Sequence, residues 1–512
     1  MKQLAARVVV GTRRGTHHSC RATISPADTA WVLWATSLVL LMIPALGLFE
    51  AGLLRAKNTT SVLTQCFAGA LLCCFCWHMV GFSLVFGTPS WGLYGSPAAY
   101  PMLLHVSLTE CFTAAPTVPM RAYAMFQMMF AAIAPLLMTG AFAERLRWPA
   151  YLGLILGFEF LVYYPVAHWV WGGGWLQRFG CIDFAGGITI HTTAGVGSIV
   201  TAWWCGPRLA CAHTSRTSRT SRTSRTSGTE SRAAAPSHEA PLLDAASNDE
   251  VGPTAGDMNA DAIRADSAHG RQLEAAAPSS LPLAAIGGAL LWLGWFGFNA
   301  GSAMSAGSVA TAAVSNTQAG AVGSSIVWMG ASSASHWRRS GRLRMSLAAV
   351  LNGMLAGLAG ITPASGFISA DWALVCGAML GMASLAVEHF VKHTLCIDDA
   401  LDVGAVHGAT GALGSLLIGV FASAAVNPTG EDGLINGGGA SLLGKQAVGV
   451  AAAVAHSAVV TSGLCFVLSR TVGLRVDASH EIIGLDQAEH EEAAYEWLVV
   501  KEGDVAGPRS LS

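Results

Sequence analysis

Eleven apolar segments, each about as long as a bilayer is thick, constrain the fold of this chain more than any other feature. A helix needs about 20 mostly apolar residues to cross a hydrocarbon core of about 30 Å. Runs of this kind occupy residues 29–53, 60–87, 122–143, 150–173, 184–206, 281–303, 308–334, 345–364, 369–391, 400–424 and 446–470. Turn-forming residues join them, as in GTPSWGLYGSP at 87–97. The sequence therefore predicts an all-α polytopic membrane protein with eleven transmembrane helices.

The composition favours this class and excludes others. Of the 512 residues, 52% are hydrophobic and 12% charged, whereas soluble domains are about 25% charged. A net charge of −2 provides no basic excess for binding nucleic acid. The twelve cysteines are scattered, several of them inside apolar runs (Cys73, Cys74, Cys76), and they form no zinc-like pattern with histidine. We therefore expect no metal, no cofactor and no disulfide framework. The one disulfide considered joins Cys111 and Cys181, because the predicted topology places both on one exterior face.

The positions of Lys and Arg in the short loops predict the orientation, because such loops are cytoplasmic when basic. Loops after spans 1, 3, 7 and 9 hold Arg55, Lys57, Arg145, Arg147, Arg338, Arg339, Arg342, Arg344 and Lys392. Loops after the even-numbered spans hold only Arg121, Arg178 and Lys445. The amino terminus is thus predicted outside and the carboxyl terminus in the cytoplasm. The basic residues in segment 1–27 disagree with this rule.

Two polar regions divide the chain further. Residues 207–279 include the repeats TSRTSRTSRTSRTS at 214–227 and almost no aromatic residue. Such a composition cannot bury enough surface to offset chain entropy. We expect a disordered cytoplasmic insertion there. The predicted regions are a basic amino-terminal tail (1–27), spans 1–5 (28–206), the insertion (207–279), spans 6–11 (280–470) and a cytoplasmic carboxyl-terminal tail (471–512).

Ionisable side chains inside the spans are functional candidates, because placing them in a membrane is costly. They are Glu50, His78, His168, His191, Asp402, His407 and His456. Span 5 enters from outside near Asp183, so His191 lies about 12 Å deeper at 1.5 Å per residue. Span 10 enters from inside, and His407 lies about 13 Å from that face. These two histidines are predicted to meet near the midplane, with adjacent glycines allowing close helix approach. His456 stands in AAAVAHSAVV without a polar companion.

Aromatic and polar side chains also gather at the predicted outer ends of spans 3, 4 and 6. They are Phe126, Gln127, Phe130, Trp171, Phe298 and Ser302. Aromatic faces attract a cation within about 6 Å, and a hydroxyl oxygen can accept its N–H. An interfacial aromatic belt produces the same pattern. Composition alone favours the belt.

Eight segments, taken in order along the chain, resemble the ammonium transporter (Amt/Mep/Rh) family, and its Amt branch most closely. They are MIPALGLFEAGLLRAKN (42–58), FQMMFAAIAPLLMTGAFAER (126–145), AHWVWGGG (167–174), DFAGGITIHTTAGV (183–196), GWFGFNAGSA (294–303), GITPASGFI (360–368), DDALDVGAVHGATGALG (398–414) and VGLRV with GLDQAEHEEAAY (472–495). The resemblance covers nearly the whole chain outside the amino-terminal tail and the insertion.

This resemblance implies a fold of two pseudo-twofold inverted halves, spans 1–5 and 6–10, with a central pore in each subunit of a homotrimer. By the same resemblance, Phe130, Trp171 and Ser302 form an outer ammonium recruitment site, and we add Phe126 to it. Phe130 and Phe298 take the positions of a stacked phenyl gate.

The resemblance also makes His191 and His407 the twin histidines of the pore, and Asp183 and Asp402 structural or site-shaping residues. The implied function is not enzymatic. It is a transmembrane transporter or channel that recruits NH4+, deprotonates it and conducts NH3, with or without a coupled proton. The chain departs from the family where phenylalanine often follows the DV pair. Gly404 stands there, so we expect looser packing beside His407.

Two other functions stay open. Histidines on different spans can ligate haem, although haem needs a wider pocket than glycine-assisted packing suggests. An ammonium sensor with weak transport is the main alternative, signalling through the insertion or the carboxyl tail. The resemblance also implies a possible cytoplasmic regulator at that tail. The expected partners are ammonium or ammonia and the lipid bilayer, without nucleic acid, and the expected location is the plasma membrane.

Overall fold

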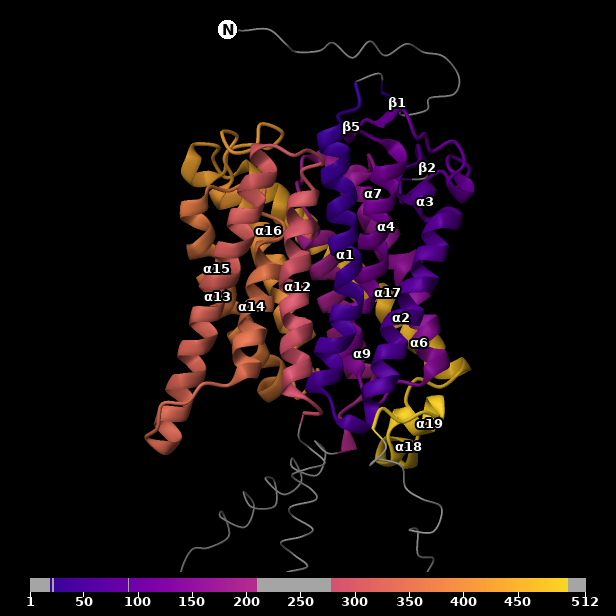
Figure 1. Cartoon of the computed structure of the whole chain (residues 1–512), viewed down its shortest axis with the longest axis vertical. Coiled ribbons are helices and arrows are strands. Elements are labelled where there is room, and N and C mark those ends of the chain that lie inside the picture. Colours follow the sequence, from indigo (N-terminus) through magenta and orange to yellow (C-terminus); the bar gives the residue numbers. More distant parts are fainter. Residues whose placement is uncertain (1–18, 21–22, 91, 210–277, 496–512) are drawn as a thin grey trace, which may run out of the picture.

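Long helices run roughly side by side in one bundle, with short strands at one end and small helices at the other (Figure 1). The computed structural model describes residues 19–20, 23–90, 92–209 and 278–495. The described residues leave out most of the predicted amino-terminal tail and most of the 207–279 insertion. The prediction that this insertion is disordered therefore falls outside them. Following the predicted topology, we call the end with strands β1–β5 the outer end and the opposite one the inner end.

Each of the first five predicted spans coincides with a helical segment. Their bounds are α1 (Pro26–Leu53), α2–η2–α3 (Thr59–Cys76, Trp77–Gly81, Phe82–Phe86), α4 and α5 (Met120–Leu136, Thr139–Phe142), α6–η4–α7 (Trp148–Phe158, Glu159–Tyr163, Tyr164–Trp171) and η5–α9 (Gly187–Thr192, Thr193–Cys205).

The six later predicted spans coincide with helical segments as well. They are α12 (Leu281–Gly301), α13 (Ser308–Ser340), α14 (Leu347–Ile361), α15–η6 (Ala370–His389, Phe390–Thr394), η7–α16 (Gly404–Ala409, Thr410–Phe421) and α17 (Ser441–Thr471). Within the described ranges, eight helices are long and apolar enough to cross a membrane. The segment α14 is shorter, and α13 and η5–α9 are richer in small polar residues. The fold is thus that of an all-α polytopic membrane protein, while eleven crossings and inverted halves stay predictions.

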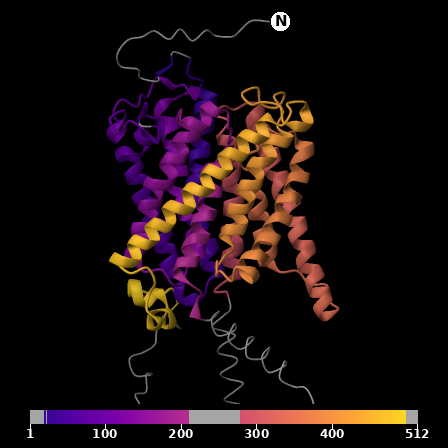
Figure 2. The same ribbon diagram turned by 180° about the vertical axis from the view of Figure 1, so that it is seen from behind.

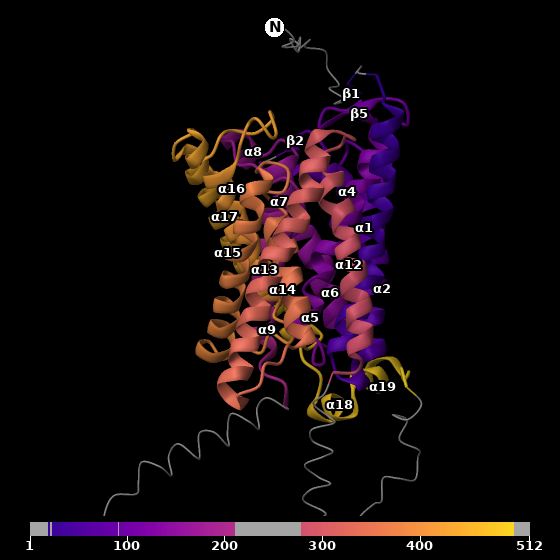
Figure 3. The ribbon, with the colours of Figure 1, turned by 60° about the vertical axis from the view of Figure 1, so that its left-hand side comes forward.

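Glycines allow close packing of α1 and α12, which lie side by side in Figures 1 and 3. A Cβ on Gly287 would lie 2.3 Å from the backbone nitrogen of Phe49, and one on Gly52 would lie 2.3 Å from that of Ala284. Without side chains at these points, the two backbones touch. From behind, α17 runs obliquely across the bundle (Figure 2).

Small elements cover the two ends. At the outer end, β1 (Ser19–Cys20), β4 (Cys111–Phe112) and β5 (Ala115–Pro119) form an antiparallel sheet in the order β1-β4-β5, and β2 (Pro89–Ser90) pairs with β3 (Tyr94–Gly95). The short helices are η1 (Ala56–Asn58), η3 (Pro101–Leu103), α8 (Trp175–Phe179), η8 (Leu434–Asn436), α18 (Ala478–Ile483) and α19 (Leu485–His490).

The considered pairing of Cys111 with Cys181 is wrong. Cys111 is disulfide-bonded, whereas Cys181 is free and buried. Strand β1 lies beside β4, and in their register Cys20 stands opposite Cys111. The sequence reasoning missed this because it assigned no structure to the amino-terminal tail.

Candidate functional site

His191 of η5 and His407 of η7 lie against each other inside the bundle. Their Nδ1 atoms are 3.2 Å apart, and their ring centroids are 5.2 Å apart with 23° between the planes. Their side chains are 1% and 7% exposed. The structure therefore brings together the two histidines that the depth argument paired, although they are 216 residues apart in the chain.

Glycines and helix irregularities explain this close approach. A Cβ on Gly195 would lie 2.2 Å from the Cα of Gly408, the residue after His407, so the two histidine-bearing segments touch through their backbones. A Cβ on Gly187 would lie 2.3 Å from the ring of Pro363. Both histidines also stand in π-helical turns, which form hydrogen bonds across five residues and occur often at functional sites.

Asp183 fixes the start of η5. Its two carboxylate oxygens accept hydrogen bonds of 2.8–3.0 Å from the backbone N–H groups of Gly186, Gly187, Ile188 and Thr189. A carboxylate is the natural partner for the unpaired N–H groups and positive dipole end of a helix. The carbonyl oxygen of Asp183 also accepts a hydrogen bond from Trp171 Nε1 at 2.8 Å. One residue thus positions both the turn of His191 and the indole of Trp171.

A column of aromatic rings leads from Trp171 to the histidines. The centroids of Trp171 and Phe130 are 6.3 Å apart, those of Phe130 and Phe298 are 4.4 Å apart, and those of Phe298 and His191 are 5.9 Å apart. The rings of Phe130 and Phe298, the predicted gate residues, meet edge to face, with 86° between their planes. The positive edge of one ring faces the negative face of the other, which is a favoured geometry for aromatic pairs.

On the outer side of this column lies a cavity of about 390 Å³. Five residues singled out in the sequence line it: Gln127, Phe130, Trp171, Asp183 and Ser302. The sequence reasoning missed Tyr123, Gln177, Asn427 and Thr429, which add further polar groups to the wall. Their loop or helix-end positions carried no motif that marked them.

Phe126, which we placed in the recruitment site, does not line this cavity. Its side chain is fully buried, with its ring centroid 4.8 Å from that of Phe130. A Cβ on Gly301 would lie 2.6 Å from the Phe126 ring, so this ring fills the space that the glycine leaves. Phe126 therefore supports Phe130 from behind instead of facing a ligand.

On the inner side of the histidines lies a second, smaller cavity of about 30 Å³. His407 lines it together with Trp295, Glu50 and Asn352. The Trp295 ring stacks on His191 at 5.5 Å and 20° and on His407 at 6.4 Å and 11°. Trp295 lies one turn before Phe298 in a quoted motif, a signal that could have identified it. Neither Phe298 nor His191 lines either cavity.

Asp402 lies at the inner end, away from the histidines. Its carboxylate pairs with Lys392 Nζ at 2.6 Å, and the neighbouring Asp399 accepts a hydrogen bond of 2.7 Å from the backbone N–H of Gly404. The looser packing expected at Gly404 is wrong. A Cβ there would lie 2.4 Å from the side chain of Ile199, which occupies the space.

The remaining intramembrane histidines lie away from this pair. His168 Nδ1 lies 2.7 Å from the carbonyl oxygen of Val85, and His456 Nε2 lies 2.8 Å from that of Leu161. The sequence suggested no companion for His456 because its partner is a backbone carbonyl of another span. His78 is exposed on the surface of the bundle. None of these three lines either cavity.

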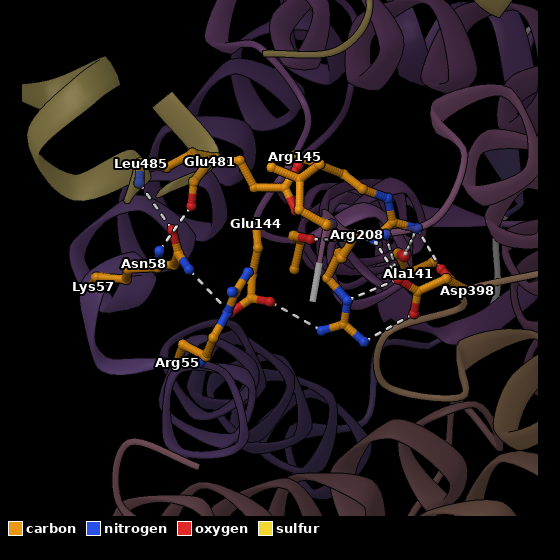
Figure 4. Close-up of polar contacts among 12 residues, drawn as sticks. Arg55, Lys57, Asn58, Ala141, Glu144, Arg145, Arg208, Asp398, Glu481 and Leu485 are labelled. Carbon is orange, nitrogen blue, oxygen red and sulfur yellow. Dashed lines mark hydrogen bonds and ion pairs between the residues drawn. The ribbon is translucent and has the colours of Figure 1, made fainter. Parts of the chain in front are cut away.

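A network of charged side chains closes the inner end (Figure 4). Glu144 accepts hydrogen bonds of 2.9 Å from Arg55 and Arg208, and Arg208 also binds both oxygens of Asp398 at 2.8 and 2.9 Å. Burial raises the pKa of Glu144, but Arg55 and Arg208 outweigh it and lower the pKa to about 2. For Asp398, burial likewise raises the pKa, and Arg208 with Arg145 lowers it to about 2. Both carboxylates are therefore charged at neutral pH.

The carboxyl-terminal segment packs against the same end. Glu481 of α18 accepts hydrogen bonds of 2.6 Å from Arg475 and from the backbone N–H of Leu209. The backbone N–H of Leu485 donates to Asn58 at 2.8 Å. The described part of the tail thus contacts the loop between spans 1 and 2 and the segment that follows span 5.

Within the described ranges, no group of three or more His, Cys, Asp or Glu side chains could hold a metal ion.

The sequence model of the Ammonium Transporter Family matches residues 30–227 and 264–495. Ammonium transporter 1 of Dictyostelium discoideum is 43% identical over 471 residues, covering 92% of this chain and 87% of the relative. Ammonium transporter Amt1 of Archaeoglobus fulgidus is 33% identical over 473 residues, covering 92% and 100%.

Solved structures are similar as well. Mep2 of Saccharomyces cerevisiae matches with a TM-score of 0.70 and 28% identity, covering 90% of this chain and 92% of that one. A protein titled Sensor Amt Protein matches with a TM-score of 0.70 and 25% identity, covering 91% and 98%.

Proposed function

The chain belongs to the ammonium transporter family and is an integral membrane protein, and on that premise we propose that it carries ammonium across the membrane past His191 and His407. In this proposal NH4+ binds in the outer cavity, gives up a proton at the ring column to water of that cavity or to the histidine pair, and continues inward as NH3. The observation that supports it most is the buried histidine contact, which lies between two cavities and behind the column of aromatic rings.

Recruitment is the first step. An ammonium ion entering the outer cavity gives up water, at a penalty of several kcal/mol. Cation–π attraction to the faces of Trp171 and Phe130, worth about 2 kcal/mol in a desolvated site, offsets part of this penalty. Ser302 Oγ donates to the carbonyl of Phe298 at 3.0 Å, which leaves its lone pairs to accept an ammonium N–H. Sodium holds its water too tightly to exchange it for rings, and potassium has no proton to donate or lose.

Passage is the second step. The edge-to-face pair of Phe130 and Phe298 is the apolar constriction in this proposal. A neutral NH3 molecule passes an apolar constriction far more easily than an ion, because it carries no charge to desolvate. Deprotonation at the rings is therefore the step that selects ammonium over metal cations.

The histidines act next. One proton between the two Nδ1 atoms makes one ring the donor and the other the acceptor, so the two Nε2 atoms take opposite roles. Nε2 of His191 is buried without a hydrogen-bond partner, so it is available to ammonia. An imidazole can pass a proton as well as hold a molecule. The pair either relays the proton, giving electrogenic transport, or only binds ammonia.

Current and uptake of ammonium, methylammonium and potassium, compared in wild type and His191→Ala, test this function. We expect ammonium-selective transport in wild type and its loss or loss of selectivity in the variant. Replacing both histidines with alanine separates the two modes, because an unaltered ammonium-selective current would contradict the relay. A wild-type protein that moves no ammonium would refute the function itself.

An ammonium sensor with weak transport is the second candidate, supported by the likeness to the solved Sensor Amt Protein. Growth of a transport-deficient host on limiting ammonium discriminates between them, because only a transporter with useful flux restores it.

We place the protein in the plasma membrane as a homotrimer, with one pore per subunit, the amino terminus outside and the carboxyl terminus in the cytoplasm. The domain division predicted from the sequence, with the 207–279 insertion and the 471–512 tail on the cytoplasmic side, belongs to the same proposal. So do the inverted relation of spans 1–5 to spans 6–10 and a regulator at the tail. The basic loops that face the inner end support the orientation.

A further inference from the structure

A buried carboxyl group lies between the histidine pair and the inner end of the bundle. Glu50 is 2% exposed and stands three residues before the end of α1 at Leu53. It lines the same cavity of about 30 Å³ as His407. Because a water-sized molecule needs about 10–15 Å³ of such volume, about two of them fit there. A small molecule in this cavity can therefore contact both His407 and Glu50.

The contacts of Glu50 suit a group that changes its protonation state. Thr139 Oγ1 lies 2.7 Å from Glu50 Oε2 and 2.5 Å from the carbonyl oxygen of Leu136. The single hydroxyl proton can therefore point to a Glu50 carboxylate, or point to Leu136 and leave the oxygen to accept from a Glu50 carboxylic acid. Rotation of one hydroxyl accommodates both forms.

The other carboxyl oxygen of Glu50, Oε1, lies beside the backbone of Gly140. The backbone N–H of Gly140 donates to the Glu50 carboxyl, and a Cβ at this glycine would lie 3.0 Å from Glu50 Oε1. Glu50 joins no ion pair among the described residues. A buried carboxyl group without a neighbouring cation favours its neutral, protonated form, in which it can donate a proton.

The neighbouring titratable groups are few. They are the thiol of Cys66 on α2, the phenol of Tyr151 on α6 and the imidazole of His407 on η7. Cys66 is fully buried, and Tyr151 donates its hydroxyl to the carbonyl of Gln65. Of these three, only His407 lines the inner cavity with Glu50.

We propose that Glu50 is the proton donor that converts ammonia into ammonium at the inner end of the pore. This inference rests on the proposed function. The O–H bond of the Glu50 carboxyl breaks, a new N–H bond forms on NH3, and NH4+ leaves with the positive charge. The resulting carboxylate regains a proton from the histidine pair if that pair relays one, or from cytoplasmic water if it does not. Atoms and charge balance in both cases.

The test uses the purified full chain in liposomes, with ammonium-evoked current and uptake recorded at several internal pH values. Glu50→Gln keeps the shape but removes the acid. We expect its maximal transport to fall at least about tenfold, as for the loss of a general acid, with the half-saturating ammonium concentration within about twofold of wild type. Its residual transport is expected to lose the dependence on internal pH. Glu50→Asp, which restores the acid, is expected to recover much of the rate.

Glu159→Gln is the matched control. Glu159 is a second buried carboxyl group, hydrogen-bonded to the hydroxyl of Tyr164 at 2.7 Å, and it lines neither cavity. We expect wild-type transport from this variant. If Glu50→Gln does not fold, Thr139→Val provides the second test, because it removes the hydroxyl that serves both forms of Glu50 and is expected to slow transport.

The outcomes separate the two proposals. A wild-type protein without ammonium-selective transport would overturn the proposed function and this inference together. Normal transport by wild type with unchanged rate and pH profile in Glu50→Gln would overturn this inference alone. An equal loss in Glu159→Gln would also overturn it, since any buried carboxyl group would then matter as much.

Discussion

Glu144 is predicted to be the most costly single charge to remove at the inner end. Its Oε1 accepts three hydrogen bonds of 2.9–3.0 Å, from the backbone N–H and Nε of Arg55 and from Asn58, and its Oε2 accepts one from Arg208. Glu144→Gln keeps the volume but removes the charge and turns an acceptor toward Arg208 into an N–H donor. Two largely buried guanidinium groups then lose a common partner.

The size of the effect follows from the pKa of Glu144. Its lowering from an ordinary value of 4.5 to about 2, at about 1.4 kcal/mol per pH unit, corresponds to about 3 kcal/mol of folding stability. This agrees with the roughly 3–5 kcal/mol measured when a buried ion pair loses one partner. For a chain of this size, a change of about 3 kcal/mol lowers Tm by about 3 °C.

Thermal unfolding of wild type and Glu144→Gln in detergent, from pH 7 to pH 3, checks this prediction. A lowered pKa means that the stabilisation is complete above about pH 4.5 and is lost as the pH falls toward about 2. The difference in Tm is therefore expected to shrink on acidification, since the glutamine amide of the variant does not titrate. Glu431→Gln is the control, because Glu431 is 53% exposed in its pair with Lys445 and is expected to contribute less than about 1 kcal/mol. Equal Tm values at pH 7, or a difference that stays constant with pH, would refute the reasoning.

Two further predictions concern the pore. Gly195→Ala forces a Cβ to within 2.2 Å of Gly408, so we expect a loss of about 1–3 kcal/mol in stability and of most ammonium current. The control is Gly444→Ala, which has nothing within 4 Å of its added Cβ and should melt and transport like wild type. Intact current in Gly195→Ala would contradict the close crossing of the two histidine-bearing segments. Trp171→Leu removes a ring face from the outer cavity and is expected to raise the half-saturating ammonium concentration about 3–30-fold. The exposed Trp175→Leu is its control in the same current recording, and an unchanged value for Trp171→Leu would argue for an interfacial belt.

The sequence was sufficient to predict features that depend only on the position of a residue along its own helix. The depth of a residue in a helix follows from its distance to the membrane edge, and this arithmetic paired His191 with His407. Helix positions followed from apolar runs in the same way. The motif pattern then selected Trp171, Ser302 and Phe130 from a set of residues that composition alone assigned to an interfacial belt, and all three line the outer cavity.

The sequence was insufficient where side chains from distant segments compete for one space. Phe126 and Phe130 are one turn apart and share a helix face, yet Gly301 of α12 draws Phe126 away from the cavity. At Gly404 the missing side chain suggested a void, but Ile199 of another span fills it. The edge-to-face angle of Phe130 and Phe298 and the disulfide at Cys111 likewise depend on partners far along the chain.

The π-helical turns that carry His191 and His407 have a consequence for insertions and deletions. Such a turn contains one residue more than the α-helical turn that could replace it. Deleting a single residue from η5 or η7 allows the turn to relax into an α-helical one, so the residues beyond it keep their orientation while the histidine within it rotates about the helix axis. The imidazoles would no longer face each other although both histidines were retained. The pairing of the two rings is therefore encoded in the number of residues per turn as well as in their identity.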